Sequence, residues 1–168
     1  MPPKFSPVIG AQGFQQSNPS VLALAALLGS LQIFKEVGMI GPIRERSIQL
    51  TGALERMLQK SKYFVPVDQV MGRYTNPDVG DPGFTIITPK DPSQRGAQLS
   101  LLFFPTGTMR KIFQGLCNYG MIGDERDPDV IRLSPAPLYN ILEDCERAAL
   151  YLEEAFNTMD KSQDKIDV

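Results

Sequence analysis

The order of its hydrophobic repeats is the feature that most constrains how this chain can fold. Four stretches place apolar residues at the spacing of a helix, and four shorter stretches are rich in apolar and β-branched residues. Two helices come first, then two strands, a helix, two strands and a last helix. This order predicts an α+β fold with helices packed on a mostly antiparallel sheet. The expected helices are 18–38, 42–60, 106–119 and 140–157, and the expected strands are 84–88, 97–104, 121–123 and 130–133.

The first helix is predicted to begin at Asn18, because Asn is a favoured N-cap residue and Pro19 suits the first helical position. With the second helix it should form a helical layer within one compact unit over 21–156. Residues 1–17 contain three prolines and two glycines and show no period, so extended backbone is expected there. The similarly punctuated stretch 63–83 predicts a long surface loop.

Composition argues against several classes of function. The 168 residues include no histidine, and Cys117 and Cys145 lie far apart, so metal binding and Ser-His or Cys-His catalysis are not expected. Both cysteines are predicted to be buried, reduced thiols. A net charge of -2 with scattered basic residues argues against a nucleic-acid partner. The longest apolar run, 21–28, is too short to span a membrane, and residues 1–14 do not resemble a secretory signal, so a cytoplasmic location is expected.

Three segments, taken in order, resemble the kynureninase family. The similarity continues between them, through 29–34 and 47–58, and covers nearly everything from Val8 to Phe156. The three segments are Gly13-Phe14-Gln15-Gln16-Ser17-Asn18-Pro19, then Ile87-Thr88-Pro89 through Arg95-Gly96-Ala97-Gln98-Leu99-Ser100, and finally Ile131-Arg132-Leu133-Ser134-Pro135-Ala136-Pro137-Leu138-Tyr139-Asn140.

The resemblance implies a fold, a reaction and a place in a larger enzyme. Kynureninases are fold-type-I pyridoxal-phosphate enzymes that hydrolyse L-kynurenine or its 3-hydroxy form to an anthranilate and L-alanine, in tryptophan catabolism and NAD biosynthesis. By resemblance, this chain is the small carboxyl-terminal domain of such an enzyme, which is expected to be a homodimer. The expected parts are a connector and active-site segment, 1–18, a small domain, 19–158, and a disordered tail, 159–168.

The resemblance also implies that part of the enzyme lies outside this sequence. None of the eight lysines stands in the surroundings that the family uses for its Schiff-base lysine, and the aspartate that pairs with the pyridine nitrogen is also missing. Pyridoxal phosphate is therefore expected in the complete enzyme and is not covalently held by this chain, which is not expected to be catalytic alone. Two interpretations stay open: part of a kynureninase-type hydrolase, or a truncated, non-catalytic relative that acts as a binding or dimerisation module.

Arg132 is the first candidate for a substrate-binding residue. It is expected on a strand just before a rigid Pro-Ala-Pro segment, where a planar guanidinium is well held to bind a carboxylate with two hydrogen bonds. The alternative is a surface arginine paired with Asp127 or Asp129. The family's substrate-carboxylate arginine falls on this position, and the resemblance therefore favours the binding role.

Ser17 and Asn18 are the second candidates. A helix N-terminus offers free N–H groups and positive potential to an anion, although capping alone would also explain Asn18. The resemblance places this Ser-Asn pair beside the substrate and the cofactor, with Ser17 assigned to substrate and Asn18 to pyridoxal phosphate. Asn140 is predicted to be only the N-cap of the last helix.

Overall fold

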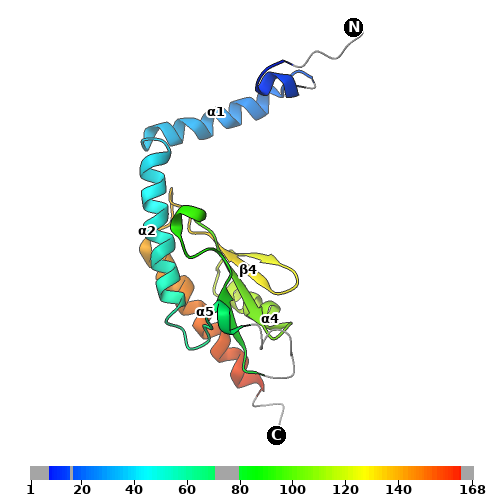
Figure 1. Cartoon of the computed structure of the whole chain (residues 1–168), viewed down its shortest axis with the longest axis vertical. Coiled ribbons are helices and arrows are strands. Elements are labelled where there is room, and N and C mark those ends of the chain that lie inside the picture. Colours follow the sequence, from blue (N-terminus) through cyan, green and yellow to red (C-terminus); the bar gives the residue numbers. More distant parts are fainter. Residues whose placement is uncertain (1–7, 16, 71–79, 164–168) are drawn as a thin grey trace. The chain divides into compact units, whose positions relative to one another are not determined.

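A computed structural model of the chain describes residues 8–15, 17–70 and 80–163, with side chains up to residue 159. It divides into two units, Met1–Pro42 and Ile43–Val168. Figure 1 shows a helical first unit, and a second unit in which helices cover one face of a sheet. The observed class is α+β with an antiparallel sheet, as the order of the hydrophobic repeats predicts.

The first unit consists of a short 3-10 helix, Ala11–Phe14, and helix α1, Val21–Glu36. The extended backbone expected over 1–17 is therefore wrong at Ala11–Phe14, and residues 1–7 and 16 lie outside the described part. The predicted cap at Asn18 is also wrong. Ser20 is the N-cap, and its hydroxyl accepts a hydrogen bond from the backbone N–H of Ala23 at 3.4 Å. A serine two positions further along satisfies the same need for an acceptor at the first turn.

None of the residues of α1 is buried. The compact unit begins at Ile43 rather than at Val21, so the expectation that α1 shares one unit with the rest of the chain is wrong. The sequence pattern explains the error, because α1 is apolar over most of its circumference and that pattern does not tell which element covers it.

The second unit is built on a four-stranded sheet with the order β1-β2-β4-β3 and antiparallel pairing throughout. The first two strands are neighbours and the last two form a hairpin. The third strand is not where the sequence placed it, at 121–123. The strands are β1, Gly83–Ile86, β2, Leu99–Phe104, β3, Asp124–Arg126, and β4, Val130–Leu133.

The short turn at Asp127–Asp129 determines where strand β3 lies in the sequence. In an antiparallel hairpin the residues next to the turn pair first, and here they are Arg126 with Val130 and Asp124 with Arg132. The apolar residues at 121–123 suggested a strand, but the charged residues after them carry the pairing.

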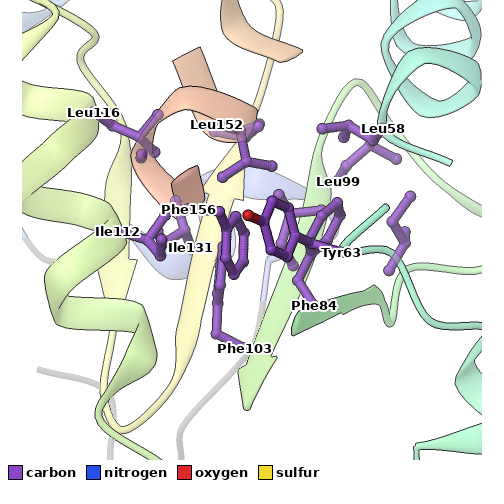
Figure 2. Close-up of a cluster of buried hydrophobic side chains, with 14 of the residues drawn as sticks. Leu58, Tyr63, Phe84, Leu99, Phe103, Ile112, Leu116, Ile131, Leu152 and Phe156 are labelled. Carbon is purple, nitrogen blue, oxygen red and sulfur yellow. The ribbon is translucent and has the colours of Figure 1, made fainter. Parts of the chain in front are cut away.

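Helices α2, α4 and α5 cover the inner face of the sheet. Figure 2 shows Phe156 of α5 beside Phe103 of β2 and Tyr63. The ring of Phe156 is fully buried and stacks on Tyr63 with 4.3 Å between centroids. The strands alternate as a half-covered sheet should, because Leu99, Leu101 and Phe103 point inward. The helices are α2, Ile40–Leu58, α4, Thr108–Asn118, and α5, Leu142–Gln163.

The start of α5 differs from the prediction. Asn140 does not cap it: the Asn140 side chain accepts from the Ala136 backbone N–H at 2.7 Å and donates to Asp144 at 3.1 Å. Asp144 instead accepts from the backbone N–H of Ile141, which is half of a capping box. The helix continues to Gln163, so the disordered tail expected from residue 159 does not begin there, and residues 164–168 lie outside the described part.

The stretch predicted as a surface loop, 63–83, is partly core. Tyr63, Val65 and Val70 are buried, and Phe64 forms an isolated bridge with Phe84 of β1. Val65 and Val70 cover Phe104 on the outer face of the sheet. Residues 71–79 lie outside the described part.

No single helix in the described ranges is long and apolar enough to cross a membrane. Helices α1 and α2 pass that test only as a broken pair, and only by length and composition.

Candidate functional site

Arg132 lies on β4, the inner strand between β2 and β3. Its register partners are Ser100 on β2 and Asp124 on β3, so the three side chains share the outer face of the sheet. Neighbouring Ile131 and Leu133 point into the core, which fixes the direction of the arginine. The side chain of Arg132 is 31% exposed, and its Nε is buried without a hydrogen-bond partner among the described residues.

Asp124 is the acidic partner of Arg132. The guanidinium donates to Oδ2 of Asp124, and Arg126 contacts the same oxygen at 3.2 Å. Asp124 is 45% exposed, so this pair stands in partial contact with water. A ligand carboxylate that binds Arg132 must therefore share the guanidinium with Asp124 or displace it.

The two partners suggested for a merely structural Arg132 have other roles. Asp127 pairs with Arg110 at 3.2 Å on the surface. Asp129 is fully buried and accepts hydrogen bonds from the backbone N–H of Gly107 and the hydroxyl of Thr106, at 3.1 and 3.3 Å. It therefore fixes the start of α4, and the suggested pairing of Arg132 with Asp127 or Asp129 is wrong.

Ser17 and Asn18 lie in the first unit, just before α1. Both are exposed, and the carbonyl of Ser17 accepts from the side chain of Gln15 at 2.9 Å. Because Ser20 caps α1, the amide of Asn18 is not needed for capping. Since Arg132 belongs to the second unit, the assignment of all three residues to one site stays a prediction.

A buried ion pair between Glu55 and Arg95 was missed by sequence reasoning. The guanidinium of Arg95 is 4% exposed, contacts both carboxylate oxygens of Glu55 and donates to the Pro89 carbonyl at 3.0 Å. The contact with Glu55 raises the pKa of Arg95 above its usual range. Arg95 stands in one of the family-like segments, and its contacts give that segment a structural role: it ties the turn between β1 and β2 to α2.

A pocket of about 540 Å³ in the second unit opens beside the start of α5. Leu54 and Leu133 form an apolar floor, and Tyr119 stacks on Tyr151 with 4.9 Å between centroids. Its polar lining includes Asn140, Asp144 and Arg147. Nothing in the linear sequence marked this pocket, because its walls come from five separate segments.

The pocket holds one acid and one thiol with shifted pKa values. The Ile141 backbone N–H, then the Asn140 side chain, hold the pKa of Asp144 below its usual range, and Arg147 acts in the same direction. Burial raises the pKa of the Cys145 thiol, and the nearby carboxylates add to the effect. Cys145 is buried as predicted, but Cys117 is exposed, so that expectation is wrong for Cys117.

The described residues do not form a complete site for pyridoxal phosphate, the cofactor that the resemblance implies. Covalent binding needs a lysine directed into a cavity. The described lysines at 35, 60, 62, 90 and 111 are all exposed. Lys111 borders a pocket of about 290 Å³ on α4 and α5, and none of the five lines the pocket beside the start of α5. No step through this cofactor is therefore derived from the chain alone.

The fold and the site together define a class of protein: an α+β domain with helices on one face of an antiparallel sheet and an arginine on the other face, without a complete cofactor site among its described residues. A family model described as "Kynureninase C-terminal domain" matches residues 43–152, and this match starts where the second unit starts. The chain belongs to the kynureninase family.

Curated relatives agree with the family model. The kynureninase of Yarrowia lipolytica is 48% identical over 161 residues, which are 95% of this chain and 36% of that protein. The kynureninase of Lodderomyces elongisporus is 43% identical over 93% of this chain and 34% of its own length. Kynureninase 1 of Chaetomium globosum is 43% identical over 90% of this chain and 28% of its own length. The chain therefore spans about a third of the length of these relatives.

Proposed function

We propose that this chain is the carboxyl-terminal part of a kynureninase-type hydrolase, which cleaves L-kynurenine or 3-hydroxy-L-kynurenine to anthranilate or 3-hydroxyanthranilate and L-alanine. The complete enzyme uses pyridoxal phosphate and is a cytoplasmic homodimer, and the cofactor lysine comes from the part of the enzyme outside this sequence. The support comes from family membership together with the position of Arg132.

Arg132 is the observation that carries the proposal. Its backbone is held by two neighbouring strands, and its side chain lies on the outer face of the sheet in a partly exposed ion pair. A planar guanidinium held in this way binds a carboxylate through two parallel hydrogen bonds. Arg132 binds the substrate carboxylate, and Ser17 and Asn18 contact the substrate and the cofactor.

The test uses a chimera in which the preceding part of the Yarrowia lipolytica kynureninase is joined to this chain. We expect Arg132→Gln to lower kcat/KM for kynurenine by at least about ten-fold, because a hydrogen bond to a charged group contributes about 1.5 to 3 kcal/mol. Arg126→Gln is the matched control. It removes the other arginine that pairs with Asp124 and should leave kcat/KM within about two-fold.

A second control separates carboxylate binding from general damage. A kynurenine analogue with an amide in place of the carboxylate should lose much less than kynurenine on Arg132→Gln. Equal losses for both substrates, or no loss for either, would show that the carboxylate is bound elsewhere.

A non-catalytic binding module is the second candidate, and the exposed lysines favour it for the chain alone. The purified 168-residue chain should form no stoichiometric, borohydride-trappable aldimine with pyridoxal phosphate. If the chimera also lacks hydrolase activity after it has bound the cofactor, the binding-module interpretation replaces the first.

A further inference from the structure

Helix α1 has an unusual surface. From Val21 to Phe34 it carries no charged residue, and successive side chains are about 100° apart around the axis. Its large apolar side chains therefore point in most directions: Leu22 and Ile33 lie on one side, and Leu24, Leu27 and Leu31 on the other. A helix that is apolar nearly all round is normally covered on several sides.

Among the described residues of the first unit, none covers these side chains. Leu22 is 83% exposed and Leu28 is 61% exposed, and the described part of the unit that precedes α1 holds a single short 3-10 helix, Ala11–Phe14. An isolated helix of 16 residues is only marginally stable in water, and most helical stability in proteins comes from packing. The stability of α1 therefore depends on a covering partner.

The relatives indicate where that partner lies. The match to the Yarrowia lipolytica protein covers 95% of this chain. The unmatched residues are fewer than the 16 residues of α1, so the match includes at least part of α1. The model of the C-terminal domain, however, begins at residue 43, after α1 has ended. At least part of helix α1 is thus shared with proteins about three times as long, but it lies outside the residues that the model of the C-terminal domain matches.

We propose that α1 is the docking element of this chain, and that it is buried on several sides by the part of a kynureninase polypeptide that precedes the C-terminal domain. The inference rests on family membership and not on the proposed reaction. It predicts that this chain binds that preceding part even when neither hydrolyses kynurenine.

Two other occupants fit the helix less well. If two copies of the chain paired through α1, each helix would cover one stripe of the other, and the opposite side of each helix would stay exposed to solvent. A membrane surface likewise covers one face and favours helices with a basic polar face, whereas Lys35 is the only basic residue of α1. An environment formed by several elements of a folded polypeptide covers all sides.

The experiment measures how well α1 is covered. Leu22→Cys serves as a reporter in a background with Cys117→Ser and Cys145→Ala, because Cys117 is exposed and Cys145 would also react once urea has unfolded the chain. Its rate of maleimide labelling, divided by the rate in urea, is measured in the 168-residue chain and in the chimera with the preceding part of the Yarrowia lipolytica protein. We expect labelling to be at least about ten-fold slower in the chimera.

A matched pair of variants tests whether docking causes the protection. Adding Leu28→Glu should restore fast labelling in the chimera, because it places a carboxylate in the covered surface. Gln114→Glu adds the same charge on the exposed side of α4, and it should leave the protection unchanged. If the chimera does not fold, the same two variants are compared by co-purification of this chain with the tagged preceding part.

Five results would overturn the proposal. Two of them are equal labelling in the chain and in the chimera, and co-purification that does not depend on Leu28. In the isolated chain, protection that rises with concentration would assign α1 to a second copy, and protection independent of concentration would assign it to residues 43–168. Protection by phosphatidylcholine and phosphatidylserine vesicles would assign it to a lipid surface. The readouts need no activity, so a chimera that binds but does not hydrolyse contradicts only the proposed function.

Discussion

Helices α1 and α5 are both long and rich in apolar residues, but only α5 buries them within its own unit. In α5 the buried residues follow a single stripe that includes Cys145, Leu152 and Phe156, and glutamates occupy the other sides. In α1 the apolar residues occupy most of the circumference, and none is buried. The comparison shows that the width of an apolar stripe indicates how many sides of a helix need a partner, but not where that partner is.

The largest expected difference between the two helices appears when one large apolar side chain is removed from each. Phe156→Ala should lower the free energy of unfolding by about 3 to 5 kcal/mol, because it leaves a cavity among buried aromatic rings. Leu22→Ala should change it by no more than about 0.5 kcal/mol in the isolated chain. Urea denaturation followed by far-ultraviolet circular dichroism measures both.

A large loss of stability on Leu22→Ala in the isolated chain would contradict this distinction between α1 and α5, since it would mean that α1 already belongs to the cooperative core. In the chimera the expectation is reversed. Leu22→Ala should be destabilising there if the preceding part of the enzyme covers α1.

Replacing a glycine in the middle of α4 or of α1 by alanine should change stability by a smaller amount, and the two changes should have opposite signs. A Cβ at Gly115 in α4 would lie 2.9 Å from the Cβ of Ala155 in α5, so Gly115→Ala should destabilise the second unit by about 1 to 2 kcal/mol after the gain in helix propensity. A Cβ at Gly29 in α1 meets nothing within 4 Å. Gly29→Ala should therefore stabilise α1 by about 0.5 to 1 kcal/mol.

Hydrogen exchange separates the two glycine effects, because it reports the opening of each helix by itself. Amides of α1 should exchange more slowly after Gly29→Ala, and amides of α4 and α5 should exchange faster after Gly115→Ala. A stabilising Gly115→Ala would show that α4 and α5 separate more easily than their contact at Ala155 indicates.

Local patterns predicted much of the second unit. The alternation in 97–104 and the helical period after Asn140 identified β2 and α5, because one side of each element is buried and the other is exposed. These features depend on residues close together in the sequence.

The errors arose where distant or competing groups decide the structure. Strand β3 was misplaced because its residues are charged and are held by pairing with β4, as Asp124 is with Arg132. Tyr63 was assigned to a surface loop because its stacking partner, Phe156, lies far along the chain. The candidate site was predictable only at Arg132, whose strand position the structure confirms, while the ion pair of Glu55 with Arg95 had no local signal.

The smallest expected effect concerns Asp144 at the start of α5. Its carboxylate accepts from the Ile141 backbone N–H and the Asn140 side chain, and it also benefits from the positive end of the helix. These contacts hold its pKa below the ordinary value of 3.8. A carboxyl group whose pKa is lower in the folded protein stabilises it above the ordinary pKa, and this contribution is lost as the pH falls through the lower folded value.

The measurement is a series of urea midpoints from about pH 7 to about pH 2 for the parent chain and for Asp144→Asn, which keeps an acceptor oxygen but loses the charge. The parent should be more stable than the variant at neutral pH, and the difference should be constant down to about pH 4 and then shrink towards zero as Asp144 takes up its proton. Because the other carboxyl groups titrate in both proteins, the difference isolates Asp144. Asp144→Ala also removes the acceptor oxygen. It should therefore stay less stable than the parent at the lowest pH, and that remaining difference measures the capping hydrogen bond without the charge. A difference that does not change with pH would show that the N–H groups of Ile141 and Asn140 bind the neutral side chain as well as the carboxylate, so that the start of α5 is held by hydrogen bonds alone.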